Sequence, residues 1–445
     1  MLGVVSELPA WLDHRSLPDD PITDEHQLGS IVGGHNPFAP LEGDLDVGVV
    51  VDADEVDEGV RLVGHGDVPV DQAVDGDPES IQFHRGAALI HARKAGRMRL
   101  PVQGREPQCD LASRGFSRHA RAVDTRRVVV TGGAGFIGSH LVERLLAAGE
   151  QVVVIDDLST GSWDNLASVR SHPGLERVES TVSAWAGLGD TVASAKAVFH
   201  LAAAVGVELV VQAPRRTIEI NLRETEAVLD AASKARTPVV FTSTSEVYGK
   251  SDKPWFSEED DLLIGPPTLS RWSYACSKLL DEFLALACHG EQGVPVVIAR
   301  LFNIVGPRQS GRHGMVLPRF VSAARAGQPL RVFGDGRQTR CLCRVQDCVE
   351  ALLRLWACPA AAGQIVNIGH DEEISILDLA QVVISELGSA STIDRVPYEA
   401  AYQSGFQDMP RRRPDLRKLE RLTGFRPRAG VRDVVRQVAG LGPAA

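Results

Sequence analysis

The stretch TGGAGFIGSH, residues 131–140, decides how the fold of this chain is interpreted. It follows the β-branched run RRVVV and precedes SHLVERLLAAG, whose apolar residues recur at helical spacing. Its glycines fit Gly133-x-Gly135-x-x-Gly138 and equally Gly132-x-x-Gly135-x-x-Gly138. A strand, a glycine turn and a helix in this order predict a phosphate-binding unit, because glycine lets the backbone approach a pyrophosphate at the helix N-terminus.

A second apolar run, QVVVIDD, ends in an acidic residue at the position that such a unit requires. Asp156 follows Gly138 by 18 residues. A carboxylate at the end of the second strand accepts hydrogen bonds from both ribose hydroxyls and repels the 2′-phosphate of NADP. The sequence therefore predicts NAD as the cofactor.

Further buried-strand candidates follow along the chain, namely AKAVFHLAA, TPVVFTSTS and VPVVIARLFN. Helical stretches such as NLRETEAVLDAASKA separate them. This alternation predicts an α/β fold with a Rossmann doubly wound parallel sheet over residues 126–305. Beyond about residue 305 the pattern loosens into mixed short elements, which predicts a smaller C-terminal lobe over residues 306–445.

Residues 1–125 differ in character from the rest of the chain. They hold 22 Asp and Glu against 11 Lys and Arg, which accounts for the whole net charge of −11. They lack sustained helical or strand periodicity. A disordered acidic extension, a small unfamiliar domain and a start codon assigned too far upstream all fit this text. The Val/Asp/Gly/Arg-rich composition favours the last, so a chain that begins near Thr125 is expected to fold and function.

Composition excludes several other classes of protein. Hydrophobic residues make up 44% and charged residues 24% of the 445 residues, as in ordinary soluble proteins. No apolar run approaches the roughly 18 residues of a membrane span, and no signal peptide is recognised at the start. Residues 126–445 carry no net charge, which gives no field for nucleic acid. The seven cysteines form no zinc pattern, so a cytoplasmic protein without metal is expected.

The stretch SYACSKLLDEFL carries the candidate catalytic pair. Tyr274 and Lys278 are four residues apart, so they share one face of a helix. A lysine cation beside a phenol favours the phenolate, and this spacing therefore predicts a lowered pKa for Tyr274. Such a tyrosine can take a hydroxyl proton while a hydride leaves the same carbon. Thr244, in TSTSEVYG at the end of a predicted strand, is placed to hydrogen-bond the same hydroxyl.

Together these motifs resemble the extended short-chain dehydrogenase/reductase family, which contains nucleotide-sugar epimerases, dehydratases and decarboxylases. The resemblance also rests on VFHLAA, RLFNIVGPR, FGDGRQTRC and NIG, and it runs from about Arg126 to Pro427. This chain departs from the family pattern at CRVQD, where Arg344 stands in place of the usual His or Tyr. The resemblance implies NAD held by a Rossmann domain, a nucleotide-diphosphate sugar as substrate, and transient oxidation at sugar C4.

The resemblance also implies a set of site residues. Thr244, Glu246, Tyr274 and Lys278 form the catalytic group. The residues expected to hold NAD, besides Tyr274 and Lys278, are Gly132, Gly135, Phe136, Ile137, Gly138, Asp156, Leu201 and Ala202. The residues expected at the substrate are Arg271, Asn303, Arg340 and Arg413, with Arg271 or Arg340 as partner for a sugar carboxylate.

The residues after Thr244 bear on which reaction follows C4 oxidation. Dehydratases of the family show Thr-Asp-Glu, whereas this chain has Thr244-Ser245-Glu246, so the acid that dehydration needs is missing. The run Thr-Ser-Glu and the segment RWSYACSK resemble the UDP-glucuronate decarboxylases. A UDP-sugar 4-epimerase is the alternative, and a non-catalytic NAD-binding module is disfavoured by the complete Thr-Tyr-Lys set. A homodimer paired through the two long predicted helices is expected.

Overall fold

The structure is a computed structural model that describes residues 126–206, 210, 212–311, 315–397, 409 and 411–442. All of these residues belong to one compact unit, Arg99–Ala445. The expectations for residues 1–125 lie outside the described residues.

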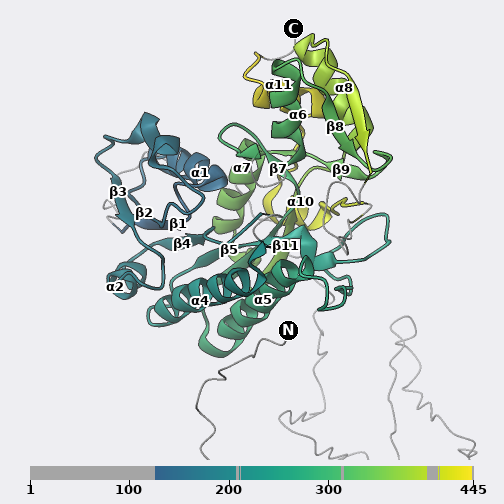
Figure 1. The fold of residues 1–445 in the computed structure, drawn as a ribbon. Helices are drawn as coiled ribbons and strands as arrows, with labels where there is room; N and C mark the ends of the chain where they lie inside the picture. Colours follow the sequence, from purple (N-terminus) through teal and green to yellow (C-terminus); the bar gives the residue numbers. More distant parts are fainter. Residues whose placement is uncertain are drawn as a thin grey trace, which may run out of the picture. The chain divides into compact units, whose positions relative to one another are not determined.

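Seven strands in the described ranges form one parallel sheet in the order β11-β6-β5-β4-β1-β2-β3 (Figure 1). They are β1 (Val128–Thr131), β2 (Val152–Asp156), β3 (Leu175–Glu179), β4 (Ala197–His200), β5 (Val239–Thr244), β6 (Val296–Leu301) and β11 (Gln364–Ile368). The chain order reverses where β1 lies between β2 and β4. This confirms the predicted doubly wound sheet and places its switch point at the carboxyl end of β1.

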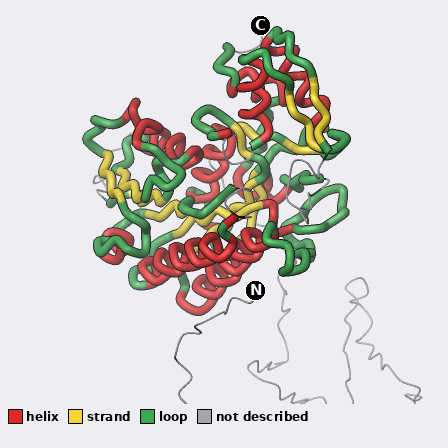
Figure 2. The backbone as a smooth tube through the Cα atoms, in the orientation of Figure 1, coloured by secondary structure: helices red, strands yellow, loops and turns green. Residues whose placement is uncertain are grey.

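Helices cover both faces of the sheet, because alternate strand residues point to opposite sides. Val128 and Val130 pack with α1 (Phe136–Ala147), α7 (Val345–Trp356) and α10 (Arg417–Thr423). Val129 packs on the other face with residues of α2 (Leu188–Ala193), α4 (Pro214–Ser233) and α5 (Trp272–Gln292). The long helices α4 and α5 run side by side along that face (Figure 2). Short 3-10 helices occupy η1 (Trp163–Val169), η2 (Ser245–Tyr248) and η4 (Pro359–Ala361).

A second hydrophobic core belongs to the C-terminal lobe. Leu317, Leu379 and Val434 lie in it, on three different helices. The lobe contains α6 (Val316–Arg325), β8 (Leu330–Phe333), α8 (Ile376–Leu387), β13 (Ile393–Val396) and α11 (Val431–Val438). Short ladders join β7 (Ile304–Val305) to β10 (Cys343–Arg344) and β9 (Thr339–Cys341) to β12 (Glu373–Ser375). A small mixed lobe was predicted here.

Residue 305 does not mark the end of the chain's contribution to the sheet. The strand β11 pairs with β6 in register from Gln364↔Val297 to Ile368↔Leu301. Side chains of α7 and α10 belong to the same core as α1. The segment 306–445 therefore supplies both the lobe and part of the Rossmann layer.

Candidate active site

The glycine turn lies at the switch point of the sheet, where Thr131 of β1 is in register with His200 of β4. Gly132 has a φ of +68°, and a Cβ there would lie 2.8 Å from the amide nitrogen of Ala202. The Leu201 amide donates to the Thr131 carbonyl at 3.2 Å, and the Ala202 amide donates to the Thr131 hydroxyl at 3.2 Å. Leu201 and Ala202 thus lie beside the glycine turn, where the sequence predicted cofactor-binding residues.

The other two glycines close the turn onto the start of α1. The Gly135 amide donates to the Gly132 carbonyl at 3.1 Å. A Cβ on Gly138 would collide with that same carbonyl oxygen. Phe136 and Ile137 open the helix, whose first turn carries no acidic residue. The result is a cradle without side chains in front of helical amide groups, and it fits a pyrophosphate.

Asp156 ends β2 beside this cradle and is 8% exposed. Its Oδ2 accepts from the Ala134 amide and its Oδ1 from the Leu158 amide, both at 2.9 Å. Burial raises the pKa of Asp156, while the two backbone hydrogen bonds act in the opposite direction. Each carboxylate oxygen keeps a second lone pair for a hydroxyl. The residues present therefore fit NAD, with Asp156 on the ribose.

Thr244 and Tyr274 meet at the end of β5. Thr244 is the last residue of that strand and caps η2, accepting from the Glu246 amide at 3.2 Å. Its side chain also hydrogen-bonds Tyr274, which lies in the first turn of α5. Burial raises the pKa of Tyr274, the nearby charges of Glu246 and Asp281 raise it further, and the Thr244 hydrogen bond opposes them. The predicted lowering of this pKa was wrong for the chain by itself, because burial outweighs the neighbouring cation.

Lys278 lies one turn after Tyr274 on the buried side of α5. Its side chain is 2% exposed, and its Nζ lies 3.1 Å from Asp281 Oδ2. The same Nζ is 3.9 Å from the centroid of the Phe241 ring. Burial lowers the pKa of Lys278, and the Asp281 carboxylate opposes that shift. Lys278 is thus held beside an aromatic ring, with the Asp281 carboxylate as a close charged partner.

Three consecutive arginines add a residue that sequence reasoning missed. Arg412 Nη1 lies 3.4 Å from Glu246 Oε1, whereas Arg411 and Arg413 both pair with Glu373. The Arg412 side chain is 12% exposed, and its Nε is buried without a hydrogen-bond partner among the residues that the structure describes. The sequence singled out Arg413, yet it is Arg412 that faces Glu246. Alternation along an extended chain separates neighbours in this way.

Two predicted substrate residues gather around the ladder of β9 and β12, close to Arg413. The Asn303 side chain donates to the Cys341 carbonyl at 3.3 Å, and Arg340 lies on the same strand, β9. The Glu373 that pairs with Arg413 is in register with Cys341. Arg413 also places its guanidinium 3.5 Å from the centroid of the Trp255 ring.

Arg271 lies at the start of α5, three residues before Tyr274. It is buried, and its guanidinium lies 5.1 Å from the centroid of the Trp272 ring. Its role at a sugar carboxylate stays a prediction.

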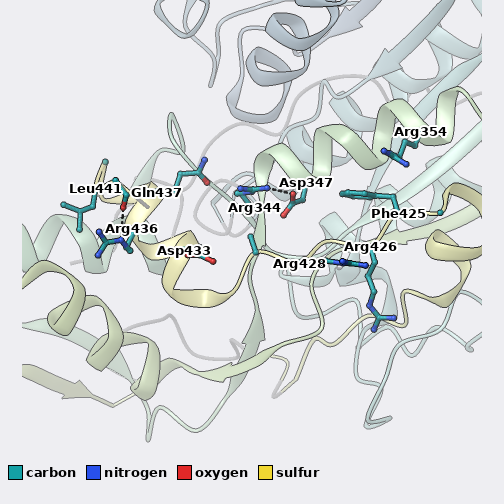
Figure 3. Close-up of a pocket in the computed structure, with 14 residues that line it drawn as sticks. Arg344, Asp347, Arg354, Phe425, Arg426, Arg428, Asp433, Arg436, Gln437 and Leu441 are labelled. Carbon is teal, nitrogen blue, oxygen red and sulfur yellow. Dashed lines mark hydrogen bonds and ion pairs between the residues drawn. The ribbon is translucent and has the colours of Figure 1, made fainter. Parts of the chain in front are cut away.

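A separate cavity of about 990 Å³ in the C-terminal part contains none of the predicted site residues. Figure 3 shows arginine side chains along it, from α7, from the segment that follows α10, and from α11. Four of the five lining arginines pair with carboxylates: Arg344 with Asp347, Arg354 with Glu350, Arg426 with Asp371 and Glu420, and Arg436 with Glu386. This pairing offsets most of the positive charge, and the cavity is not the candidate active site.

The fold and the site define an NAD-dependent enzyme of the short-chain dehydrogenase/reductase type, with a tyrosine and a lysine beside a dinucleotide cradle. Residues 128–369 match the model of the NAD dependent epimerase/dehydratase family. The chain belongs to this family, which confirms the resemblance drawn from the motifs. No helix within the described ranges is long and apolar enough to cross a membrane.

Relatives of known activity align with the same part of the chain. A UDP-N-acetyl-alpha-D-glucosaminuronate decarboxylase of Bacillus cytotoxicus is 41% identical over 68% of this chain and 93% of its own length. UDP-glucuronic acid decarboxylase 1 of Arabidopsis thaliana is 34% identical over 69% of this chain and 67% of its own length. Among solved structures, a UDP-glucuronic acid 4-epimerase of Bacillus cereus, in complex with UDP-glucuronic acid and NAD, is 27% identical. It aligns with a TM-score of 0.64 over 71% of this chain and 98% of its own.

Proposed function

We propose that this chain decarboxylates a UDP-linked uronic acid through transient oxidation of the sugar at C4. The pair of Glu246 and Arg412 beside Tyr274 carries this proposal. A guanidinium next to the reacting sugar suits a carboxylate, and the Arg412 Nε keeps a donor for it. The two decarboxylases that align with most of the chain add support.

Three side chains act on the C4 hydroxyl of the sugar in the proposed reaction. Tyr274 takes the proton of the C4 hydroxyl, with Thr244 holding the same hydroxyl and Lys278 supplying positive charge nearby. NAD, when bound, accepts the hydride from C4 and returns it at the end of the cycle. A ketone at C4 makes the C5 carboxylate a β-keto acid, which loses carbon dioxide to leave an enolate. A proton then adds at C5, hydride returns to C4, and Tyr274 gives its proton back to the C4 oxygen, so the sugar ends one carboxyl group shorter.

The residue after Thr244 argues against dehydration. Ser245 is buried, and its hydroxyl is a poor acid compared with the Asp that dehydratases place there. Glu246 is paired with Arg412, with Arg412 Nη1 at 3.4 Å from Glu246 Oε1. A 4-epimerase is the second candidate, favoured by the alignment with the Bacillus cereus enzyme.

Product analysis separates these reactions. The purified protein should be incubated with NAD and one nucleotide sugar at a time, and the masses of the products measured by mass spectrometry. The sugars to test are UDP-glucuronate, UDP-N-acetylglucosaminuronate, UDP-galacturonate and UDP-glucose. We expect a UDP-pentose or its 2-acetamido counterpart and carbon dioxide from a uronate. Products of unchanged mass with inverted configuration at C4 would show that the enzyme is a 4-epimerase and not a decarboxylase.

Arg412→Ala tests the role of the guanidinium directly. We expect kcat/KM for the uronate to fall about 10- to 100-fold or more, since a charge-assisted hydrogen bond contributes about 1.5–3 kcal/mol. Arg411→Ala is the matched control, because Arg411 belongs to the same arginine run but pairs with Glu373 away from Glu246. Equal losses in both variants would remove Arg412 from the carboxylate site.

We further propose a cytoplasmic homodimer joined through α4 and α5. Leu280 and Phe283 of α5 are 51% and 64% exposed, and large apolar side chains at such exposure favour a partner surface. The cytoplasmic placement is supported by the six free cysteines of the described ranges, five of them buried.

A further inference from the structure

A buried chain of polar side chains connects the cofactor turn to the catalytic lysine. The Thr131 hydroxyl lies 2.8 Å from His200 Nδ1, and His200 Nε2 lies 3.3 Å from the Thr225 hydroxyl. Thr225 is a neighbour of Asp281 that favours its charged form, and Asp281 Oδ2 lies 3.1 Å from Lys278 Nζ. All five side chains are almost completely shielded from solvent. Two strands, β1 and β4, and two helices, α4 and α5, contribute to this group of side chains, although the reaction as derived above uses only Lys278.

The Thr131 hydroxyl accepts from the Ala202 amide and lies 2.8 Å from His200 Nδ1. Burial lowers the pKa of His200 to about 3, with the Lys278 charge acting the same way, so the imidazole is neutral. The charge that faces Lys278 here therefore comes from Asp281 and not from His200.

We propose that Asp281 is a positioning residue that keeps the buried Lys278 ammonium protonated and aimed at the active site, and that Thr225 of α4 supports Asp281 in this role. The proposal rests on the role of Lys278 in the NAD-dependent step and not on which sugar is bound. Without a close carboxylate, an amine that is 2% exposed would lose its proton to burial. A neutral lysine could no longer stabilise the Tyr274 phenolate.

The other groups that face Lys278 do not replace Asp281. Glu282 also favours the charged lysine, but it is held by Arg300 of β6, with Arg300 Nη2 at 2.7 Å from Glu282 Oε2. His200 on β4 is neutral, and Phe241 on β5 contributes only its ring face. From η2, Glu246 acts on Tyr274 and is paired with Arg412. Asp281 is thus the carboxylate in direct contact with the amine.

The test measures the protonation of Lys278 itself. The chain has seven lysines, so selective isotopic labelling at Cε gives few NMR signals, and Lys278→Arg identifies the one of interest. In Asp281→Asn we expect the pKa of Lys278 to fall by at least about one unit, a tenfold change in its protonation equilibrium. The alkaline limb of kcat should move to lower pH by the same amount, because activity needs the charged lysine. An unchanged Lys278 titration in a variant that still binds NAD would overturn the proposal.

Two further variants separate positioning from general damage. Glu224→Gln is the matched control, since Glu224 is a buried carboxyl on α4 that accepts from the Ser183 amide and hydroxyl. It should leave the Lys278 titration where it was. Thr225→Val removes the hydroxyl next to Asp281 at nearly constant volume and should shift Lys278 in the same direction by a smaller amount. If Asp281→Asn does not fold, no shift in Thr225→Val sinks the proposal.

Discussion

Tyr274 is the side chain on which the proposed proton transfer depends most directly. We expect Tyr274→Phe to lower kcat about 10²- to 10⁴-fold, the usual contribution of a positioned acid–base group. NAD should still be released on denaturation, because the ring stays in place. Tyr248→Phe is the matched control. The Tyr248 hydroxyl donates to Asn367 Oδ1 at 2.8 Å, within a cluster of aromatic residues. That variant should lose stability and keep its turnover, whereas near-normal turnover in Tyr274→Phe would contradict the assignment.

At the same scale, side chains with fixed spacing could be predicted and side chains that meet through the fold could not. Tyr274 and Lys278 stand one helical turn apart, so the sequence alone places them together. Arg412 and Glu246 are 166 positions apart in the sequence and meet only through the fold. A run of three arginines does not indicate which of the side chains faces the site. Asp281 carried no signal either, because an acid next to a lysine on a helix usually belongs to a solvated face.

Among the elements, the turn between β1 and α1 has the least tolerance for change. We expect Gly138→Ala to abolish retention of NAD, because its Cβ collides with the Gly132 carbonyl and the cradle must open. Gly290→Ala, in α5, is the control. A Cβ at Gly290 meets nothing within 4 Å, and alanine there should add about 0.5–1 kcal/mol to the free energy of unfolding. Thermal unfolding and absorbance of released NAD measure both effects. Bound NAD in Gly138→Ala would refute the cradle.

The strands that the sequence identified are those with apolar residues on both faces. The runs at β1, β2, β4, β5 and β6 are buried on both sides and read as continuous hydrophobic stretches. The two edge strands are different. The β3 sequence LERVE contains no fully buried residue, and β11 lies in a segment of mixed composition that was assigned to the lobe. These two segments are strands because they pair with a neighbouring strand. The amino-acid sequence of the segment does not reveal that pairing.

For the whole molecule, the proposed dimer can be tested on one exposed side chain. Phe283 is 64% exposed on α5, and Phe283→Glu should give a folded monomer in sedimentation at micromolar concentration, because a charge cannot be buried in an apolar contact. Leu263→Glu is the control, since Leu263 is 51% exposed in the segment before α5. It should leave the dimer intact. A native protein that sediments as a monomer would remove the dimer from the proposal.

The return of the chain to the sheet through β11 and α10 has a thermodynamic consequence. After β6 the chain passes into the lobe, returns for β11, leaves again for α8 and β13, returns for α10, and ends in α11. Neither the sheet layer nor the lobe is therefore made of one continuous segment. Unfolding of the lobe is expected to loosen β11 and α10, which pack in the sheet layer. Residues 126–442 should lose their structure in a single cooperative transition, with calorimetric and van't Hoff enthalpies that agree.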